Sequence, residues 1–235
     1  MMSTFWFVLA GLALLGAVML MYLDRARPEP AKHSRSEWAA IRGLDYTPAM
    51  DSLEGRWKRG VFDEVEDGHA VEVAGGLYEG SQLYLFDLRF ADVVETPGGK
   101  QSEQVETITI LALQRPIGSA VVFDLRSETS PAPREDEVNI LGAVGRFFAF
   151  SDDLDVARRV CDRRMVAFAE AAPEVIEVLW SEGDWSFCWL AETASANDWD
   201  DAIAALARFS SLLRVLPPDR PRTAPTPAVH DPGHP

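Results

Sequence analysis

Cysteine and histidine, which most often bind transition metals or act as nucleophile and general base, are scarce in this chain. Its 235 residues include two cysteines and four histidines. Cys161 and Cys188 match no Cys-x-x-Cys or zinc-ligand spacing, and their apolar neighbours predict small buried hydrophobes. A disulfide between them would be possible only if the domain faced the outside of the cell. His69 has no G-x-S-x-G motif to accompany it, so a turn or strand-edge histidine is expected. The sequence predicts no cofactor, no metal site and no catalytic residue, and an enzyme is the least favoured function.

Basic side chains are outnumbered by acidic ones. The chain has 22 Lys and Arg against 37 Asp and Glu, a net charge of −15. Residues 41–216 hold 16 of the basic and 32 of the acidic groups, which gives this region a net charge of −16. Phosphate backbones need clustered Lys and Arg, so a nucleic-acid partner is excluded. Anionic lipid headgroups would repel the same region.

Charged residues are absent from the first 23 positions, which also lack His, Asn, Gln and Pro. About 20 apolar residues span a bilayer as a helix, so residues 1–23 are predicted to be a transmembrane anchor. A cleaved signal peptide is the alternative. Against it, no basic residue precedes the stretch, the stretch exceeds the roughly 7–15 residues of a signal h-region, and the bulky Met19–Leu23 offers no cleavage site.

Basic residues after the predicted anchor set its orientation. They are Arg25, Arg27, Lys32 and Arg35, whereas only the α-amino group precedes the anchor. The positive-inside rule then predicts an outside N-terminus and a cytoplasmic domain at the inner (plasma) membrane.

Three regions follow the anchor. Residues 24–40 are predicted to be a basic juxtamembrane linker, because Pro28 and Pro30 cannot continue a helix for long. Residues 41–216 form one domain. Residues 217–235 form a Pro-rich tail with too few bulky apolar side chains to order itself.

The spacing of apolar residues and the positions of helix-capping and turn residues predict the helices and strands of the domain. Helices are expected over 36–42, 48–57, 152–169 and 197–213, with an acidic loop at 63–67. Strands are expected over 70–75, 82–94, 105–114, 120–125, 146–150, 175–180 and 185–191. Short reversals at 78–81, 96–100, 115–118 and 181–184 favour antiparallel neighbours, because parallel ones need a long crossover. The fold class is therefore α+β, with a largely antiparallel sheet of about seven strands packed by helices.

Aromatic residues crowd the last part of the predicted sheet. Alternation places Trp185, Phe187 and Trp189 on one face of a strand. Two interpretations are open: core packing, or an apolar groove that receives a lipid chain or a partner helix.

Arginines are dense only in the predicted helix 152–169. Arg159 and Arg163 would share a face, with Arg158 and Arg164 beside it. They form either a solvated face that pairs with nearby aspartates, or a dock for an acidic partner segment or the membrane surface.

The layout and several short blocks resemble actinobacterial single-span membrane proteins of the trehalose monomycolate transport factor (TtfA) type. The blocks are Ile41–Tyr46, Leu53–Trp57, Gly76–Gly80, Leu85–Asp87, Val144–Phe150 and Ala157–Met165. The resemblance implies an anchored cytoplasmic domain with a seven-stranded antiparallel sheet. It also implies an accessory role beside an RND-type inner-membrane exporter of mycolic acid esters.

Two functions are compatible with these features. The first is a non-enzymatic, membrane-anchored accessory factor of cell-envelope lipid transport that binds a membrane transporter, with Trp38, Arg56 and Trp57 as candidate contacts. The second is a lipid- or ligand-binding module that uses the aromatic face of the sheet.

Overall fold

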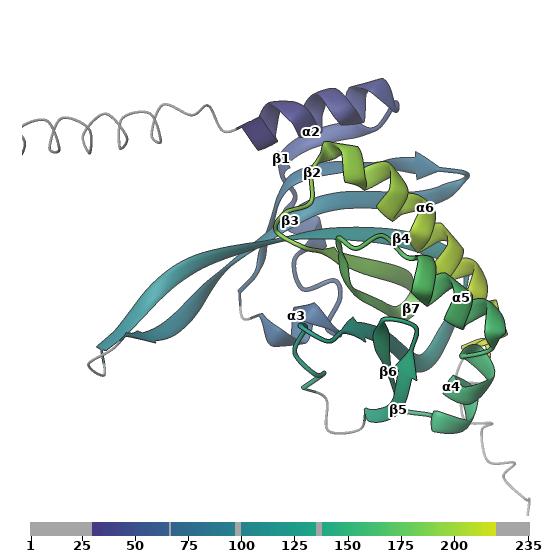
Figure 1. Cartoon of the computed structure of the whole chain (residues 1–235). Helices are drawn as coiled ribbons and strands as arrows, with labels where there is room; N and C mark the ends of the chain where they lie inside the picture. The colour runs from purple at the N-terminus through teal and green to yellow at the C-terminus, as the bar shows by residue number, and fades with distance from the viewer. Residues whose placement is uncertain (1–29, 66, 97–99, 135–137, 220–235) are drawn as a thin grey trace, which may run out of the picture.

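The computed structural model describes residues 30–65, 67–96, 100–134 and 138–219 (Figure 1). Within them lies one seven-stranded sheet whose strand pairs are all antiparallel. Its strands are β1 (Asp45–Ala49), β2 (His69–Tyr78), β3 (Ser81–Thr96), β4 (Lys100–Ser127), β5 (Asn139–Val144), β6 (Phe147–Ser151) and β7 (Ile176–Leu190). The helices are α2 (Pro30–Ile41), α3 (Val61–Glu64), α4 (Leu154–Val160), α5 (Arg163–Ala171) and α6 (Ala196–Leu212), with 3₁₀ turns η1 (Asp51–Leu53) and η2 (Leu213–Val215). The predicted α+β class and antiparallel sheet are confirmed.

The predicted anchor, residues 1–23, and most of the predicted tail lie outside the described residues. In the part of the chain that is described, no helix combines the length and the apolar character needed to cross a bilayer. The anchor therefore stays a prediction.

The sheet is built around two long strands, β4 and β7. β3 pairs with the first part of β4 and β6 with its last part, whereas β7 pairs with β4 from Thr109 to Arg126. The remaining strands extend this arrangement in the order β1-β2-β3-β4-β6-β5.

Two of the predicted reversals, at 115–118 and 181–184, are wrong, because both lie inside these long strands. They face each other: the β4–β7 register shifts between Gln114 and Ser119, and Ser119 pairs with Gly183. Gly183 has a φ of +55°, and the buried Arg115 guanidinium donates to its carbonyl. Glycine and proline thus mark opposed bulges, where strands bend and twist more strongly. The predicted strands 105–114 and 120–125 are one strand, β4, and the predicted strands 175–180 and 185–191 are one strand, β7. β1 and β5 were not predicted, and with them the sheet has seven strands, the number expected.

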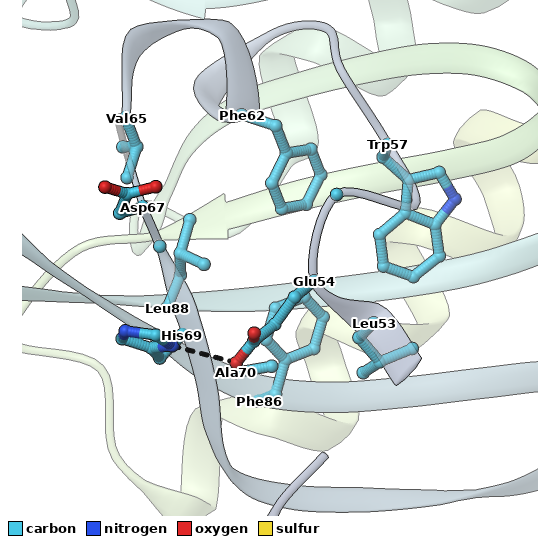
Figure 2. A pocket seen from close by; sticks show the side chains of 12 residues that line it. Leu53, Glu54, Trp57, Phe62, Val65, Asp67, His69, Ala70, Phe86 and Leu88 are labelled. Carbon is cyan, nitrogen blue, oxygen red and sulfur yellow. Dashed lines mark hydrogen bonds and ion pairs between the residues drawn. The ribbon is translucent and has the colours of Figure 1, made fainter. Parts of the chain in front are cut away.

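Side chains from both faces of the sheet are covered. Along β3, Leu83 and Leu85 join the core on the side of α2, α4, α5 and α6. Tyr84, Phe86 and Leu88 alternate with them and pack against Leu53, Trp57 and Val61 on the other side of the sheet. We call the covering segment, residues 50–65 and 67–68, the flap (Figure 2).

The helix predicted over 48–57 is wrong, because residues 45–49 pair with β2 at the edge of the sheet. Pro48 is tolerated there, since an edge strand leaves one row of backbone groups unpaired. Gly55 and Gly60, with φ of +62° and +63°, then turn the chain within the flap. The predicted acidic loop at 63–67 begins inside α3.

The helix predicted over 152–169 is two helices with two caps. Asp153 accepts hydrogen bonds from the N–H groups of Asp155 and Val156 and begins α4. Asp162 does the same for Arg164 and Met165 and begins α5. The last helix, α6, begins at Ala196 and is capped by Ser195, slightly earlier than predicted.

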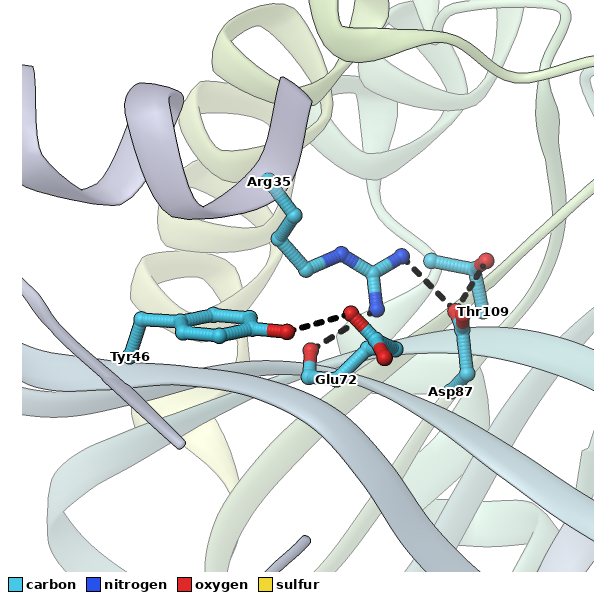
Figure 3. Close-up of polar contacts among 5 residues, drawn as sticks. All are labelled: Arg35, Tyr46, Glu72, Asp87 and Thr109. Carbon is cyan, nitrogen blue, oxygen red and sulfur yellow. Dashed lines mark hydrogen bonds and ion pairs between the residues drawn. The ribbon is translucent and has the colours of Figure 1, made fainter. Parts of the chain in front are cut away.

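Helix α2 is joined to the sheet by a partly buried polar network (Figure 3). The Arg35 guanidinium donates to the Glu72 carbonyl at 2.9 Å and to Asp87 Oδ1 at 2.7 Å. Thr109 donates to the same Asp87 oxygen at 2.8 Å, and the Tyr46 hydroxyl donates to Glu72 Oε2 at 2.5 Å. We call these five residues the Arg35 network.

Glu72 is placed for this network by unusual backbone geometry. Its φ is +53°, rare for a residue other than glycine, and the β2–β3 register shifts between Val71 and Ala74. Such strain persists only where surrounding contacts stabilise it, and two partners from other elements, Arg35 and Tyr46, bind this one residue.

The predicted linker 24–40 therefore needs correction. Its second half is helical from Pro30, not from Ser36, and it packs into the folded unit through Arg35, Trp38 and Ala39. Arg35 is 4% exposed, so it cannot count among the charges that face lipid headgroups.

Replacing Asp87 by alanine should lower the free energy of unfolding by about 3 kcal/mol, because the buried Arg35 guanidinium loses its counter-ion. Urea denaturation of wild type and variant measures this. The exposed Arg158–Asp155 pair supplies the control, since Arg158→Ala should change stability little. Equal losses in the two variants would contradict a special role for the Arg35 network.

Burial, together with the hydrogen bond to the Glu72 carboxylate, raises the pKa of Tyr46 to about 12. Because the neutral phenol is favoured in the folded state, its contribution to stability is present below pH 10 and is lost as the pH rises toward 12. Ultraviolet titration should show a tyrosine that ionises late, and Tyr46→Phe should remove it. An unchanged titration curve in Tyr46→Phe would disprove the assignment.

Candidate functional site

A cavity of about 480 Å³ lies beneath the flap (Figure 2). Its apolar walls come from the flap and from β2 and β3; they are Leu53, Trp57, Phe62, Val65, Ala70, Phe86 and Leu88. Its polar side chains are Glu54, Asp67 and His69, and His69 Nδ1 lies 2.9 Å from Glu54 Oε1. Small-molecule sites have this size and this mixture of apolar walls with a few polar groups.

Trp57 is the centre of the aromatic cluster that supports this cavity. Its ring centroid lies 5.0 Å from that of Phe187, 5.1 Å from that of Trp185 and 5.5 Å from that of Phe62. Each such edge-to-face or offset pair stabilises the fold by about 0.5–1.5 kcal/mol beyond area burial. The flap is therefore packed onto the sheet through its aromatic side chains.

Two contacts tie the flap to the bulge of β7. The Glu182 carboxylate accepts hydrogen bonds from the N–H groups of Lys58 and Arg59 at 3.1 and 3.2 Å. Gly60 packs directly on Trp180, since an added Cβ would lie 2.6 Å from the indole Nε1. The bend in the sheet thus positions the roof of the cavity.

The predicted aromatic face divides between two environments. Trp185 and Phe187 are 4% and 0% exposed, so they are core residues beneath the flap. Trp189 is half-buried; it packs against the same cluster and also lines a second hollow, of about 570 Å³, with Arg35 and Trp199. The predicted contacts Trp38 and Trp57 are also buried, and Trp38 packs edge-on against Trp199 at 5.3 Å.

Arg56 is the predicted contact residue that the flap leaves exposed. Its guanidinium lies 5.1 Å from the ring centroid of Trp57 and 4.8 Å from that of Trp185. These cation–π contacts hold the charge over the aromatic cluster while it still faces water.

The arginines of α4 and α5 do not form the shared face that the sequence predicts. Arg159 lies on α4 and Arg163 on α5, so the break at Asp162 separates them. Arg158 pairs with Asp155 at 2.7 Å, as expected for a solvated face. The hydrogen bond from Arg164 holds the pKa of Asp162 below its usual range.

Arg163 and Arg164 instead line a groove of about 880 Å³ between α5 and α6, together with Arg208 of α6. The remaining lining residues are Ala167, Phe168, Ala171, Ala172, Pro173, Asp201 and Ala205. We call this hollow the α5–α6 groove. The sequence did not reveal it, because its two walls are about 40 residues apart in the chain.

The cysteines are free thiols: Cys188 is buried and Cys161 is half-buried. Burial raises the pKa of Cys161 to about 11 and that of Cys188 further, so both are protonated at neutral pH. His69 is exposed at the start of β2, as expected. Among the described residues, no group of three or more His, Cys, Asp or Glu side chains is arranged to hold a metal ion.

The flap is the part of the candidate site that the sequence analysis missed. Its signals were present in Gly55 and Gly60, which flank Trp57, because glycines with positive φ around a large aromatic residue indicate a packed loop as well as a helix end.

Comparison with known proteins identifies the family. The model of the family "Trehalose monomycolate transport factor TtfA" matches residues 2–235. Trehalose monomycolate transport factor A of Mycolicibacterium smegmatis (strain ATCC 700084 / mc(2)155) is 37% identical over 217 residues, which are 92% of this chain and 72% of that protein. The crystal structure of the mycobacterial transport factor TtfA matches with a TM-score of 0.71 and 36% identity, over 83% of this chain and 100% of that one. The chain therefore belongs to the TtfA family of trehalose monomycolate transport factors.

Proposed function

We propose that this protein is a non-enzymatic, membrane-anchored accessory factor of cell-envelope lipid transport. The transported lipids are mycolate esters, and the protein acts by binding an RND-type inner-membrane exporter. One observation carries the proposal. The family match runs over residues 2–235, so it includes the predicted anchor as well as the folded unit. A relative that is 37% identical is named for the transport of trehalose monomycolate.

The attachment of α2 supports a role at the membrane. Helix α2 begins at Pro30, seven residues after the predicted anchor ends at Leu23. The Arg35 network and the Trp38–Trp199 contact fix this helix to the sheet. A domain joined in this way has a restricted orientation relative to its anchor, which favours docking onto a membrane-embedded partner.

The charges near the anchor support a cytoplasmic domain. With Arg35 buried, Arg25, Arg27 and Lys32 remain as the basic residues that follow the apolar stretch. Three positive charges on one flank and no basic side chain on the other still favour an outside N-terminus.

A second function, binding of an apolar ligand, is favoured by the cavity beneath the flap. The aromatic core on which the flap packs is the sheet face that the sequence indicated, and the open volume lies beside it. About 480 Å³ of space walled by Leu53, Phe62 and Leu88 fits an acyl chain, with Glu54 and His69 placed to bind a polar group.

Depletion of the protein should stall export of an envelope mycolate ester, and a chain that begins at residue 24 should fail to restore it, because the domain would no longer be held beside the exporter. Thin-layer analysis of labelled envelope lipids measures both effects. An unrelated apolar span joined to residue 24 is the matched control and should restore export. Normal lipid traffic in the depleted strain would refute the transport role.

Brominated fatty acid should quench the fluorescence of Trp57 if the cavity binds an acyl chain. In the full-length protein, Trp57→Phe should weaken the quenching, because Trp180 and Trp185 stay in the same cluster, whereas Trp38→Phe, on the opposite face of the sheet, should leave it unchanged. Identical quenching in wild type and Trp57→Phe would rule out acyl binding under the flap.

A further inference from the structure

The α5–α6 groove has the shape of a helix-binding site. The lining positions Arg164, Phe168 and Ala171 on α5, and Asp201, Ala205 and Arg208 on α6, recur every three or four residues. Each lining stripe therefore follows the length of its helix. α5 and α6 contact each other on the helical face of the sheet (Figure 1).

Small side chains form most of the floor. Ala167, Ala171 and Ala205 project little, and between them Phe168 and Ala172 are 9% and 8% exposed. A third helix could approach closely over such a floor, because packing distance between helices depends on the size of the side chains at the contact.

The charge of the groove is opposite to that of the domain. Three arginines and one aspartate line it, whereas residues 41–216 carry a net charge of −16. Arg164 is already hydrogen-bonded to Asp162. In the described parts of the chain, Arg163 and Arg208 are exposed and no carboxylate lies within ion-pair distance of either. The groove thus offers two unpaired cations beside an apolar floor.

This combination selects one kind of occupant. An amphipathic helix can place apolar residues at i, i+3, i+4 and i+7 on the floor and acidic residues against Arg163 and Arg208. A bilayer surface is a poorer match, because it is flat and its anionic headgroups would meet the acidic domain around the groove.

We propose that the α5–α6 groove is the docking surface for an acidic amphipathic helix on the cytoplasmic side of the exporter. The proposal rests on the proposed function and adds the partner's chemistry. Apolar contact with Phe168 and the alanines gives affinity, and ion pairs with Arg163 and Arg208 give orientation and specificity.

Recovery of the exporter from membranes with tagged full-length protein tests both proposals. The double variant Arg163→Glu/Arg208→Glu should recover the exporter at least about five-fold less than wild type, because two attractive charge pairs become repulsive. The matched control Arg89→Glu/Arg214→Glu makes the same charge change at exposed positions outside the groove and should recover as much as wild type. Ala205→Trp should also reduce recovery, because it fills the floor. Thermal unfolding shows whether each variant is folded.

The outcomes separate the two proposals. If wild type recovers the exporter and the double variant recovers it equally well, the groove is not the docking surface, and the accessory role stands. If wild type recovers no exporter, the accessory role fails and the docking proposal fails with it.

The membrane alternative is tested by a fluorophore on Ala205→Cys in full-length protein held in nanodiscs. A spectral shift that appears only when the exporter, recovered with wild type, is present in the nanodisc supports docking. A shift produced by phosphatidylglycerol nanodiscs without the exporter, and not by phosphatidylcholine ones, would overturn it in favour of a lipid contact.

Discussion

The pairing of β4 with β7 through opposed bulges is the constraint on which the other parts of this structure depend. Strands as long as these cannot stay flat, because strand twist accumulates along them. The bend is possible because Gly118 lets two backbones approach, since a Cβ there would lie 3.3 Å from the Asp184 nitrogen, and because Gly183 adopts a φ of +55°. β3 and β6 then share one central strand, and β7 carries Trp180 and Glu182, which hold the flap. A substitution that straightened this bend would move the cavity roof without touching the cavity.

The two faces of the bent sheet carry different hollows. Under the flap the core holds an aromatic cluster around Trp57, and the cavity lies beside it. On the other face four helices cover the larger core, and the hollow forms outside it, between α5 and α6. An internal ligand and an external partner could therefore bind at the same time. The sheet between them offers a physical link, although no coupling follows from proximity alone.

Local signals in the sequence predicted where the chain changes direction but not how. Alternating apolar residues indicated the strand at 82–94, and the structure buries side chains on both of its faces. Glycine and proline at 115–118 and 183 marked irregularities, yet a bulge and a hairpin require the same residues, and only the pairing partner distinguishes them. Asp162 capped a helix where apolar spacing continued without a break, so the arginine face was misassigned. Arg35 looked like a solvated charge, because its partners Glu72 and Asp87 lie 37 and 52 residues away.

Arg163 and Arg208 of the α5–α6 groove differ from two nearby arginines, Arg158 and Arg164, which form ion pairs on their own helices. Arg158 and Arg164 each have an aspartate two or three residues away. Arg163 and Arg208 line the groove together with its alanines, and among the described residues neither lies within ion-pair distance of a carboxylate. At physiological ionic strength a charge acts over about 8 Å, so the net charge of the domain does not cancel these two cations at contact distance. A partner with both carboxylates and apolar side chains would pair with the two arginines and bury the apolar floor, whereas a small anion would only pair with the arginines.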